Sequence, residues 1–250
     1  MRWIGSLTFS VVMIVATIIT AIIMVLLSPL PFRMLTHIAR SYARFIIGSL
    51  EMLCGIHFQV RGLEHVQQPQ GAAIIFCKHQ SAWETYALQL FFPPQVWVLK
   101  RELMWVPFFG WGMAALRPIA IDRSSGQKAI KQIVAQGKQR LDKGIWVTIF
   151  PEGTRVAPGQ HKKWGIGGAI LAEQSGYPIV PVAHNAGEFW ARRAMLKNPG
   201  TVQVVIGPPI ETRGLKATEI NQRVQAWMDA AMAEIAQQTR PGSIAEGSPT

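Results

Sequence analysis

The sequence predicts an α/β fold, with a mostly parallel central sheet flanked by helices and an N-terminal hydrophobic, membrane-anchoring helical segment. Three observations predict it. Short apolar and β-branched runs recur along the chain after residue 70, stretches with helical periodicity lie between them, and the first 30 residues are almost wholly apolar. At 250 residues, the chain has room for one sizeable domain or two small ones.

The composition narrows the class of protein. Apolar residues make up 49% of the chain and charged residues 16%, with a mean hydropathy of +0.20, which excludes disorder over most of the length. The formal net charge of +11 favours an anionic partner: nucleic acid, anionic lipid or acidic protein. The two cysteines, Cys54 and Cys77, are too few for a disulfide framework or a four-thiolate zinc site, and we expect both in the core of a reduced compartment.

The N-terminal segment is long enough to anchor the chain in a membrane. No charged residue occurs from Trp3 to Phe32, and a helix over Leu7–Leu27 is about 32 Å long, against about 30 Å for the hydrocarbon core. A cleaved signal peptide is disfavoured, because the run is too long and no cleavage pattern follows it. Three arginines after the segment favour a cytoplasmic location for the rest of the chain: Arg33, Arg40 and Arg44.

A second stretch, Phe45–Val60, is too short and too mixed to span a membrane, and we expect an interfacial or core helix there. Residues 1–60 therefore form the predicted anchor. It is either one transmembrane helix or a helical hairpin that dips into one leaflet, and the sequence leaves both open.

Residues 61–240 form the predicted soluble domain, and residues 241–250 a disordered tail rich in Gly, Ser and Pro. The predicted strands are Ala72–Phe76, Val96–Leu99, Ile119–Ile121, Ile145–Phe150, Ile179–Ala183 and Val202–Ile206. Amphipathic helices are predicted over residues 128–141 and 220–235. Buried strands separated by helices are typical of a parallel sheet.

Polar clusters follow three of these strands directly. They are Lys78-His79, Lys100-Arg101-Glu102 and the run from Pro151 to Arg155. The carboxyl ends of parallel strands meet at one edge of a sheet, where ligands of α/β proteins bind. We therefore expect an imidazole, carboxylates and several cations to converge there.

His79 begins the hexapeptide HQSAWE, which ends at Glu84. A neutral imidazole just before a helix can act as a general base, and a carboxylate bonded to its other nitrogen fixes the tautomer. The same residues also match the S-x-x-E capping box, in which Glu84 only satisfies a backbone donor of Ser81. Both roles remain open on the sequence alone.

The hexapeptide FPEGTR, Phe150–Arg155, places a turn between a carboxylate and a guanidinium at a strand end. Its glycine allows close backbone approach to a ligand, and arginine presents planar donors that suit phosphate. An ordinary surface turn with an ion pair fits these residues equally well.

Together these segments resemble the glycerolipid acyltransferases. HQSAWE resembles their HxxxxD block, with Glu84 in place of the aspartate, and FPEGTR matches their block without a mismatch. The run from Lys100 to Gly110, closing with Ile121-Asp122-Arg123, resembles the second block, and Val180–Gly187 the fourth. The order and spacing agree over about residues 70–190, and with the hydrophobic N-terminus the likeness is greatest to bacterial-type 1-acylglycerol-3-phosphate acyltransferases.

The resemblance implies roles for individual residues. His79 is the expected general base and Glu84 its orienter, while Lys100 and Arg155 bind the acceptor's phosphate, with Arg123 as a further candidate. Glu152, Gly153 and Thr154 shape the turn and position the acceptor. The aromatic run Met104–Trp111 lines an acyl slot, enters the bilayer or packs in the core.

The implied reaction is acyl transfer from an acyl thioester to the 2-hydroxyl of 1-acylglycerol-3-phosphate (lysophosphatidate), which forms phosphatidic acid. It needs no metal or cofactor, only an acyl-carrier-protein or coenzyme A thioester as co-substrate. The expected partners are membrane lipids, and the expected location is the inner membrane with the catalytic domain on the cytoplasmic face. The alternatives are another acceptor, such as glycerol-3-phosphate or a different lysolipid, and a non-catalytic module that binds anionic lipid.

Other classes fit less well. The cations are scattered, and the chain lacks a zinc-finger or RNP signature of nucleic-acid binding. It also lacks the G-x-S-x-G motif of a serine hydrolase and the H-E-x-x-H spacing of a zinc hydrolase.

Overall fold

The computed structural model describes residues 2–239, so the predicted tail over 241–250 lies outside the described residues. Its centre is a seven-stranded sheet with the order β1-β7-β6-β2-β5-β3-β4. The strands are β1 (Ile56–Arg61), β2 (Ile74–Cys77), β3 (Gln95–Lys100), β4 (Ile119–Ile121), β5 (Trp146–Ile149), β6 (Ile179–His184) and β7 (Gly200–Ile206). Every neighbouring pair is parallel except β6 and β7, which confirms the predicted α/β class with a mostly parallel sheet.

Strand β1 is absent from the sequence prediction, and the helix expected over Phe45–Val60 is wrong in its second half. Helix α2 (Phe32–Cys54) ends at Gly55, which adopts φ 65° and donates its N–H to the carbonyl of Glu51 at 2.9 Å. Beyond it the chain alternates between inward apolar and outward polar side chains and pairs with β7. A left-handed glycine after the last helical turn is a common helix terminator, and here it separates helix from strand.

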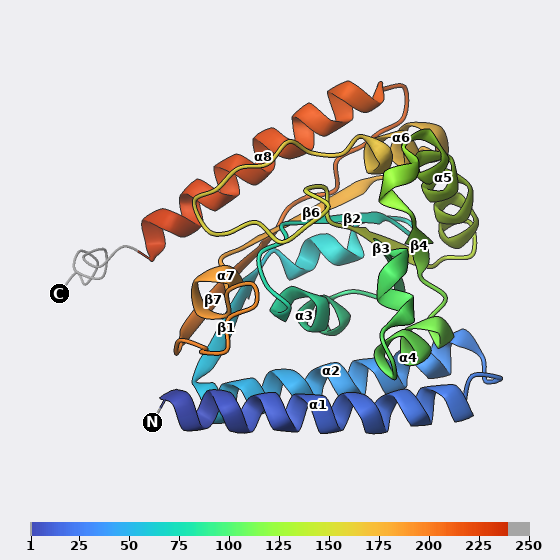
Figure 1. Cartoon of the computed structure of the whole chain (residues 1–250). Coiled ribbons are helices and arrows are strands. Elements are labelled where there is room, and N and C mark those ends of the chain that lie inside the picture. Colours follow the sequence, from blue (N-terminus) through green and yellow to red (C-terminus); the bar gives the residue numbers. More distant parts are fainter. Residues whose placement is uncertain (1, 240–250) are drawn as a thin grey trace.

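Helices cover both faces of the sheet (Figure 1). One face carries α3 (Trp83–Phe91), then α2, then the outermost helix α1 (Arg2–Leu26). The other face carries α5 (Gln127–Leu141), α6 (Gly167–Ser175) and α8 (Ala217–Gln238). Two short helices complete the fold, α4 (Phe109–Ala115) beside α1 and α7 (Ala186–Phe189) after β6.

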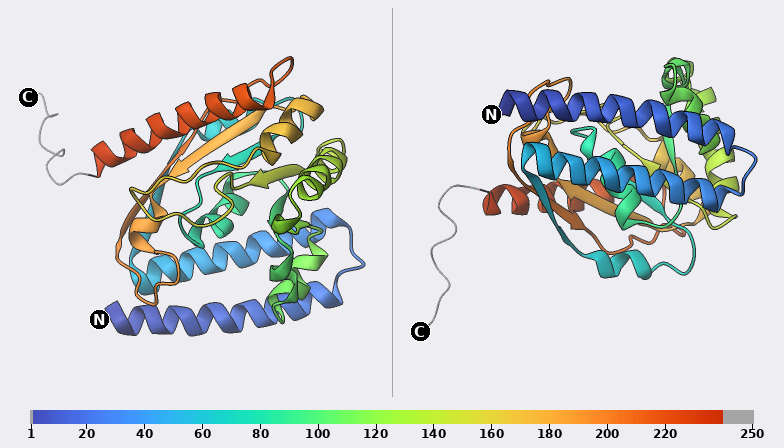
Figure 2. Two further views of the ribbon diagram at one scale, coloured as in Figure 1. Left: turned by 45° about the horizontal axis from the view of Figure 1, so that its top comes forward. Right: turned by 90° about the horizontal axis from the view of Figure 1, so that it is seen from below.

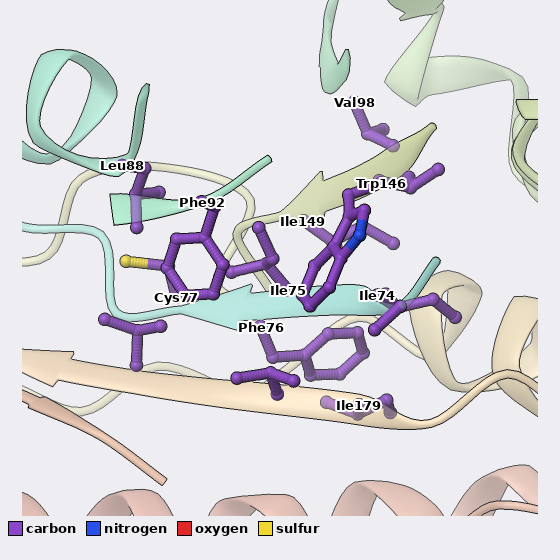
Figure 3. Close-up of a cluster of buried hydrophobic side chains, with 14 of the residues drawn as sticks. Ile74, Ile75, Phe76, Cys77, Leu88, Phe92, Val98, Trp146, Ile149 and Ile179 are labelled. Atoms are coloured by element: carbon purple, nitrogen blue, oxygen red, sulfur yellow. The ribbon is translucent and has the colours of Figure 1, made fainter. Parts of the chain in front are cut away.

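The core lies around β2, whose four residues are all buried. Figure 3 shows them among side chains from α3, β5 and β6. The surrounding residues are Leu88, Phe92, Val98, Trp146, Ile149 and Ile179. Full burial of one such side chain stabilises a fold by about 1.5–3 kcal/mol. The packing of β2 therefore fixes the position of the loop that follows it.

Helices α1 and α2 form an antiparallel hairpin (Figure 2). Their close approach requires glycine, because a Cβ on Gly5 would lie 2.1 Å from the carbonyl oxygen of Leu53. Pro31 directly precedes α2, where the fixed φ of proline suits the start of a helix. Among the described residues, α1 is the one helix long and apolar enough to cross a membrane.

The outward side of α1 is an apolar stripe along its whole length. Its members recur at helical spacing and are Trp3, Ile4, Leu7, Val11, Ile14, Val15, Ile19, Ile22, Ile23, Val25 and Leu26. Neighbouring exposed side chains extend this surface, namely Leu103, Trp105, Val106, Phe109 and Trp111. Exposed apolar surface of this extent marks a membrane or protein contact.

Candidate active site

The polar clusters that follow the parallel strands converge at one edge of the sheet. His79 comes two residues after β2, Lys100 ends β3, and FPEGTR begins one residue after β5. The segments also contact one another through the backbone, because the N–H of Val156 donates to the carbonyl of His79 at 2.8 Å. The Arg123 side chain donates to the carbonyl of Gly153. The expected convergence is therefore present.

A histidine–carboxylate pair stands at the centre of this edge. His79 Nδ1 lies 2.8 Å from Glu84 Oε1, which also accepts the backbone N–H groups of Gln80 at 2.9 Å and Ser81 at 2.8 Å. A carboxylate can only accept, so the neutral form of His79 carries its proton on Nδ1 and keeps a free lone pair on Nε2. This arrangement can remove a proton from a bound hydroxyl.

Glu84 fills both roles that the sequence left open. It bonds to His79, and its carboxylate accepts the N–H of Ser81, as in the capping box. The other half of the box differs, because Ser81 Oγ accepts the N–H of Trp83 at 3.2 Å and Ala82 directly precedes α3. A glutamate where the family has aspartate therefore still reaches the imidazole. The cap holds α3 and, through the same oxygen, orients the histidine.

The carboxylate of Glu84 is ionised despite its burial. Its side chain is 1% exposed, which raises the pKa, but the bond from His79 and the N–H of Ser81 lower it, and the pKa ends below its ordinary value. The second oxygen, Oε2, has no hydrogen-bond partner among the described residues. A charged, fixed acceptor stabilises an imidazolium at His79 during a reaction.

His184, within the segment that resembles the family's fourth block, lies 3.9 Å from Glu84 Oε2. Its Nε2 lies 2.8 Å from the carbonyl of Lys78, and its Nδ1 accepts the N–H of Ala186 at 3.2 Å. Burial lowers the pKa of His184, so this ring is neutral and donates from Nε2. Its signal in the sequence was its position at the end of a buried strand.

One face of the His79 ring is covered by Phe150. The two rings are stacked, with centroids 4.0 Å apart and planes inclined by 16°. The imidazole is 17% exposed and lines a cavity. Phe150 belongs to FPEGTR, so this motif shapes the environment of the base as well as supplying charged groups.

Glu152 pairs with a lysine beside His79 and does not line the cavity that contains His79. Its side chain is fully buried, and its Oε1 lies 2.8 Å from Nζ of Lys78, the residue before His79. Gly153 follows with φ 67° and donates its N–H to the carbonyl of Phe150 at 2.9 Å, while Thr154 is half-buried. These contacts shape the turn.

The predicted phosphate-binding cations do not all line the cavity. Lys100 and Arg123 line the cavity with His79, and Lys100 pairs with Glu102 at 3.2 Å. Arg155 is half-buried near Glu84, and burial lowers the pKa of its guanidinium. No ion pair or hydrogen bond occupies the Arg155 side chain within residues 2–239.

The cavity has a volume of about 210 Å³ and extends from His79 between α1, α2, α3 and β3. Its walls are mostly apolar and include Ala21, Met24, Trp97, Leu99, Met113 and Leu116. Phe109 of the aromatic run also lines it, whereas Trp105 and Trp111 are 66% and 53% exposed, so this run serves both cavity and surface. Within the described part of the chain, no cluster of three His, Cys, Asp or Glu residues could hold a metal.

Comparison with known proteins supports the arrangement. A family model described as "Acyltransferase" matches residues 57–185. A 1-acyl-sn-glycerol-3-phosphate acyltransferase of Pseudomonas aeruginosa is 49% identical over 82% of this chain and 81% of its own length. One of Limnanthes alba is 29% identical over 93% and 82%. The crystal structure of the 1-acyl-sn-glycerophosphate acyltransferase of Thermotoga maritima has the same fold, with a TM-score of 0.78, 18% identity, and coverage of 96% of this chain and 97% of that one. The chain therefore belongs to the acyltransferase family and is an acyltransferase enzyme.

Proposed function

We propose that this enzyme transfers an acyl group from a thioester to the 2-hydroxyl of 1-acylglycerol-3-phosphate and so forms phosphatidic acid. The observation that carries the proposal is the His79–Glu84 pair, whose imidazole lines a mostly apolar cavity together with Lys100 and Arg123. The acceptor has the same two parts, an acyl chain and a phosphate. The likeness to the Pseudomonas enzyme supports the choice of acceptor.

In the proposed mechanism, His79 Nε2 takes the proton of the 2-hydroxyl as the oxygen attacks the thioester carbonyl. The new C–O bond forms, and the resulting imidazolium is stabilised by Glu84 at 2.8 Å. The C–S bond then breaks, and the departing thiolate takes from His79 the proton that came from the acceptor hydroxyl. No covalent acyl-enzyme forms, because the acceptor hydroxyl is itself the nucleophile. Base assistance of this kind typically contributes about 10²–10⁴ in rate.

The two ends of the acceptor go to chemically different surroundings. The apolar cavity suits the acyl chain, because α1, α2 and β3 line it with aliphatic and aromatic side chains. Lys100 and Arg155 bind the phosphate, as an ammonium point charge and a planar guanidinium fork respectively. Arg123 contributes its charge nearby, while one of its nitrogens holds the turn at Gly153.

Turnover with a labelled acyl thioester tests the proposal. Purified enzyme in detergent is given 1-acylglycerol-3-phosphate or glycerol-3-phosphate, with carrier-protein and coenzyme A thioesters in separate reactions. We expect phosphatidic acid from the lysolipid, and a fall of about 10²–10⁴ in turnover for His79→Ala. His161→Ala, at an exposed histidine, is the matched control and should keep full activity. Lipid binding without product from any thioester would instead support a non-catalytic lipid-binding module.

We further propose that α1 and α2 lie in one leaflet of the inner membrane, with the α/β domain on its cytoplasmic side. Both ends of α1 contact that domain. Near its start, Ser6 Oγ accepts the N–H of Lys197 at 3.0 Å, and near its end a Cβ on Gly112 of α4 would lie 3.1 Å from Ala21 Cα. A helix of 25 residues is about 37 Å long, so one that crossed the bilayer upright would lose one of these contacts.

Depth-dependent fluorescence quenching distinguishes the two anchors. A fluorophore is attached to single cysteines at Ile4, Val15 and Ile23, which are exposed along α1, in a Cys54→Ala background. Equal, shallow depths at the three sites are expected for a hairpin in one leaflet. A gradient that is deepest at Val15 would contradict the proposal and favour a spanning helix.

A further inference from the structure

The loop from Trp190 to Asn198, between α7 and β7, joins the membrane helix to the active site. On one side, α7 is tied to the segment after His79, because Gly187 donates its N–H to Gln80 Oε1 at 3.2 Å. On the other side, α1 holds the end of the loop through the bond between Lys197 and Ser6. Figure 2 shows the loop beside the start of α1.

The contacts between this loop and α1 involve a buried lysine. Lys197 is 3% exposed, and its Nζ donates to Ser10 Oγ at 2.9 Å and to the carbonyl of Met195 at 3.0 Å. The ammonium also lies 5.3 Å from the ring centroid of Phe9 and 5.5 Å from that of Trp190. It has no carboxylate partner within residues 2–239. Hydrogen bonds and cation–π contacts stabilise this charge, and two of them, with Ser10 and Phe9, exist only while the loop is docked on α1.

The same loop carries two exposed arginines, Arg192 and Arg193. Their loop follows α7, which packs against the segment after Arg155, because a Cβ on Gly187 would lie 3.2 Å from Pro158 Cδ. Both arginines add to the effect of burial in lowering the pKa of the Arg155 guanidinium, while Glu84 acts in the opposite direction. Arg193 has φ 61°, a left-handed conformation that is unfavourable for an arginine. Across residues 2–239, none of these three arginines has an ion-pair or hydrogen-bond partner for its side chain.

The cations at the cavity differ. Lys100 pairs with Glu102 and Arg101 with Asp122, at 3.2 and 3.1 Å, and Arg123 donates to a backbone carbonyl. Arg192 and Arg193 have no such partner, and their charges repel that of Arg155, which Glu84 offsets only in part. A phosphate bound by the three guanidinium groups removes that repulsion.

We infer that Arg192 and Arg193 bind the acceptor's phosphate together with Arg155, and that Lys197 is the positioning residue that places their loop on α1. The inference rests on the proposed function and deepens it. It makes docking of the membrane helix a condition for headgroup binding. A lysolipid that enters from the leaflet beside α1 then meets the phosphate site where the loop and the helix join.

Steady-state kinetics of the full chain test the inference. In the Arg192→Gln/Arg193→Gln variant, we expect the apparent KM for 1-acylglycerol-3-phosphate to rise about 10-fold or more, with kcat and the KM for the acyl thioester within about twofold. Arg213→Gln/Arg223→Gln removes the same charge from exposed positions on the opposite side of the sheet and should change neither KM. Thermal melting of each variant establishes that it folds.

Lys197 is tested by the same split between KM and kcat. Lys197→Met should raise the acceptor KM without changing the donor KM, and combining it with the arginine pair should add little, because both act on one contact. Lys197→Arg should retain more of the acceptor binding, since a guanidinium keeps the charge between the two rings. Losses that add fully would contradict the positioning role.

Two results overturn the inference without touching the proposed function. The first is an unchanged acceptor KM in the Arg192→Gln/Arg193→Gln variant. The second is a rise in the donor KM that equals or exceeds the rise in the acceptor KM, which would mean that the arginines bind the carrier of the thioester. Wild-type enzyme that makes no phosphatidic acid would overturn the proposed function and the inference together.

Discussion

Two buried carboxylates at the end of β2 have almost the same geometry and different partners. Glu84 lies 2.8 Å from His79, and Glu152 lies 2.8 Å from Lys78, the preceding residue. Both carboxylates are at most 1% exposed, and both keep one oxygen without a hydrogen-bond partner among the described residues. Each also belongs to one of the two motifs that identify the family.

The partners decide what each pair can do. An imidazole with one protonated nitrogen keeps a lone pair, and His79 presents it to the cavity. An ammonium has no lone pair to accept a proton, and Lys78 does not line that cavity. The same carboxylate geometry therefore supports proton transfer on one side of β2 and holds the FPEGTR turn on the other.

Glu84→Gln should have the largest effect. A neutral amide cannot stabilise the imidazolium and allows the wrong tautomer of His79, so turnover should fall by about 10²–10⁴. Stability should fall far less than turnover, because the amide oxygen can still accept the N–H of Ser81 and only the contribution of the ionised carboxylate is lost. Turnover and melting temperature are measured on the same preparation, and a parallel loss of both would show that capping outweighs orientation.

Glu152→Gln should act mainly on stability. It leaves the Lys78 ammonium buried beside a neutral group, and breaking a buried pair in this way costs about 3–5 kcal/mol of unfolding free energy. Denaturant titration measures this loss, and turnover per folded molecule should fall far less than in Glu84→Gln.

The double variant Lys78→Met/Glu152→Leu is the control for that prediction. Replacing both partners with apolar side chains of similar volume removes the unpaired charge, so the unfolding free energy should return close to that of the wild type. A loss as large as that of the single variant would mean that the charges themselves support the turn.

Gly153→Ala, next to Glu152 in the turn, should lower the unfolding free energy by less than Glu152→Gln does. An added Cβ meets no atom closer than Arg123 Nη1 at 4.0 Å, so only the backbone conformation, φ 67°, opposes the change. The left-handed conformation costs an alanine about 1–2 kcal/mol, which denaturant titration detects. A larger loss, with an equal loss of turnover, would indicate that the turn itself contacts the substrate.

The smallest expected effect is the contribution of the Glu84 carboxylate to the pH dependence of stability. The pKa of Glu84 is lower in the folded protein than the value of about 4.3 expected in the unfolded chain. The ionised carboxylate therefore stabilises the fold fully above the unfolded pKa, and this stabilisation is lost as pH falls through the folded pKa. A tenfold difference in acidity between the folded and unfolded carboxyl corresponds to about 1.4 kcal/mol of stability. Melting temperatures from about pH 3 to 7 should therefore fall more steeply toward acid for the wild type than for Glu84→Gln, and equal slopes would contradict the prediction.

Much of the fold followed from local patterns. Six strands and the two amphipathic helices were predicted because continuous apolar runs and three-to-four-residue spacing are properties of short segments. The first strand was missed because its alternating residues directly follow a helix, and only the conformation of Gly55 separates the two. The antiparallel pairing of β6 with β7 depends on contacts between segments, for which the sequence has no local signal.

The candidate site divides in the same way. Its motifs, the dyad and the shared edge were predictable, because the carboxyl ends of parallel strands must meet. The partner of Glu152 and the proximity of His184 to Glu84 were not, because both join residues from different strands or loops.

The sequence by itself determined the chemistry that this protein has available: a base, its carboxylate, a set of cations and an apolar helix. Only the tertiary structure decided which carboxylate meets the imidazole, which cations stay unpaired and which helix closes the cavity. The physical reason is the distance along the chain over which each effect acts. Periodicity and turn chemistry act over a few residues, whereas burial and charge pairing depend on which distant segments the packed sheet brings together.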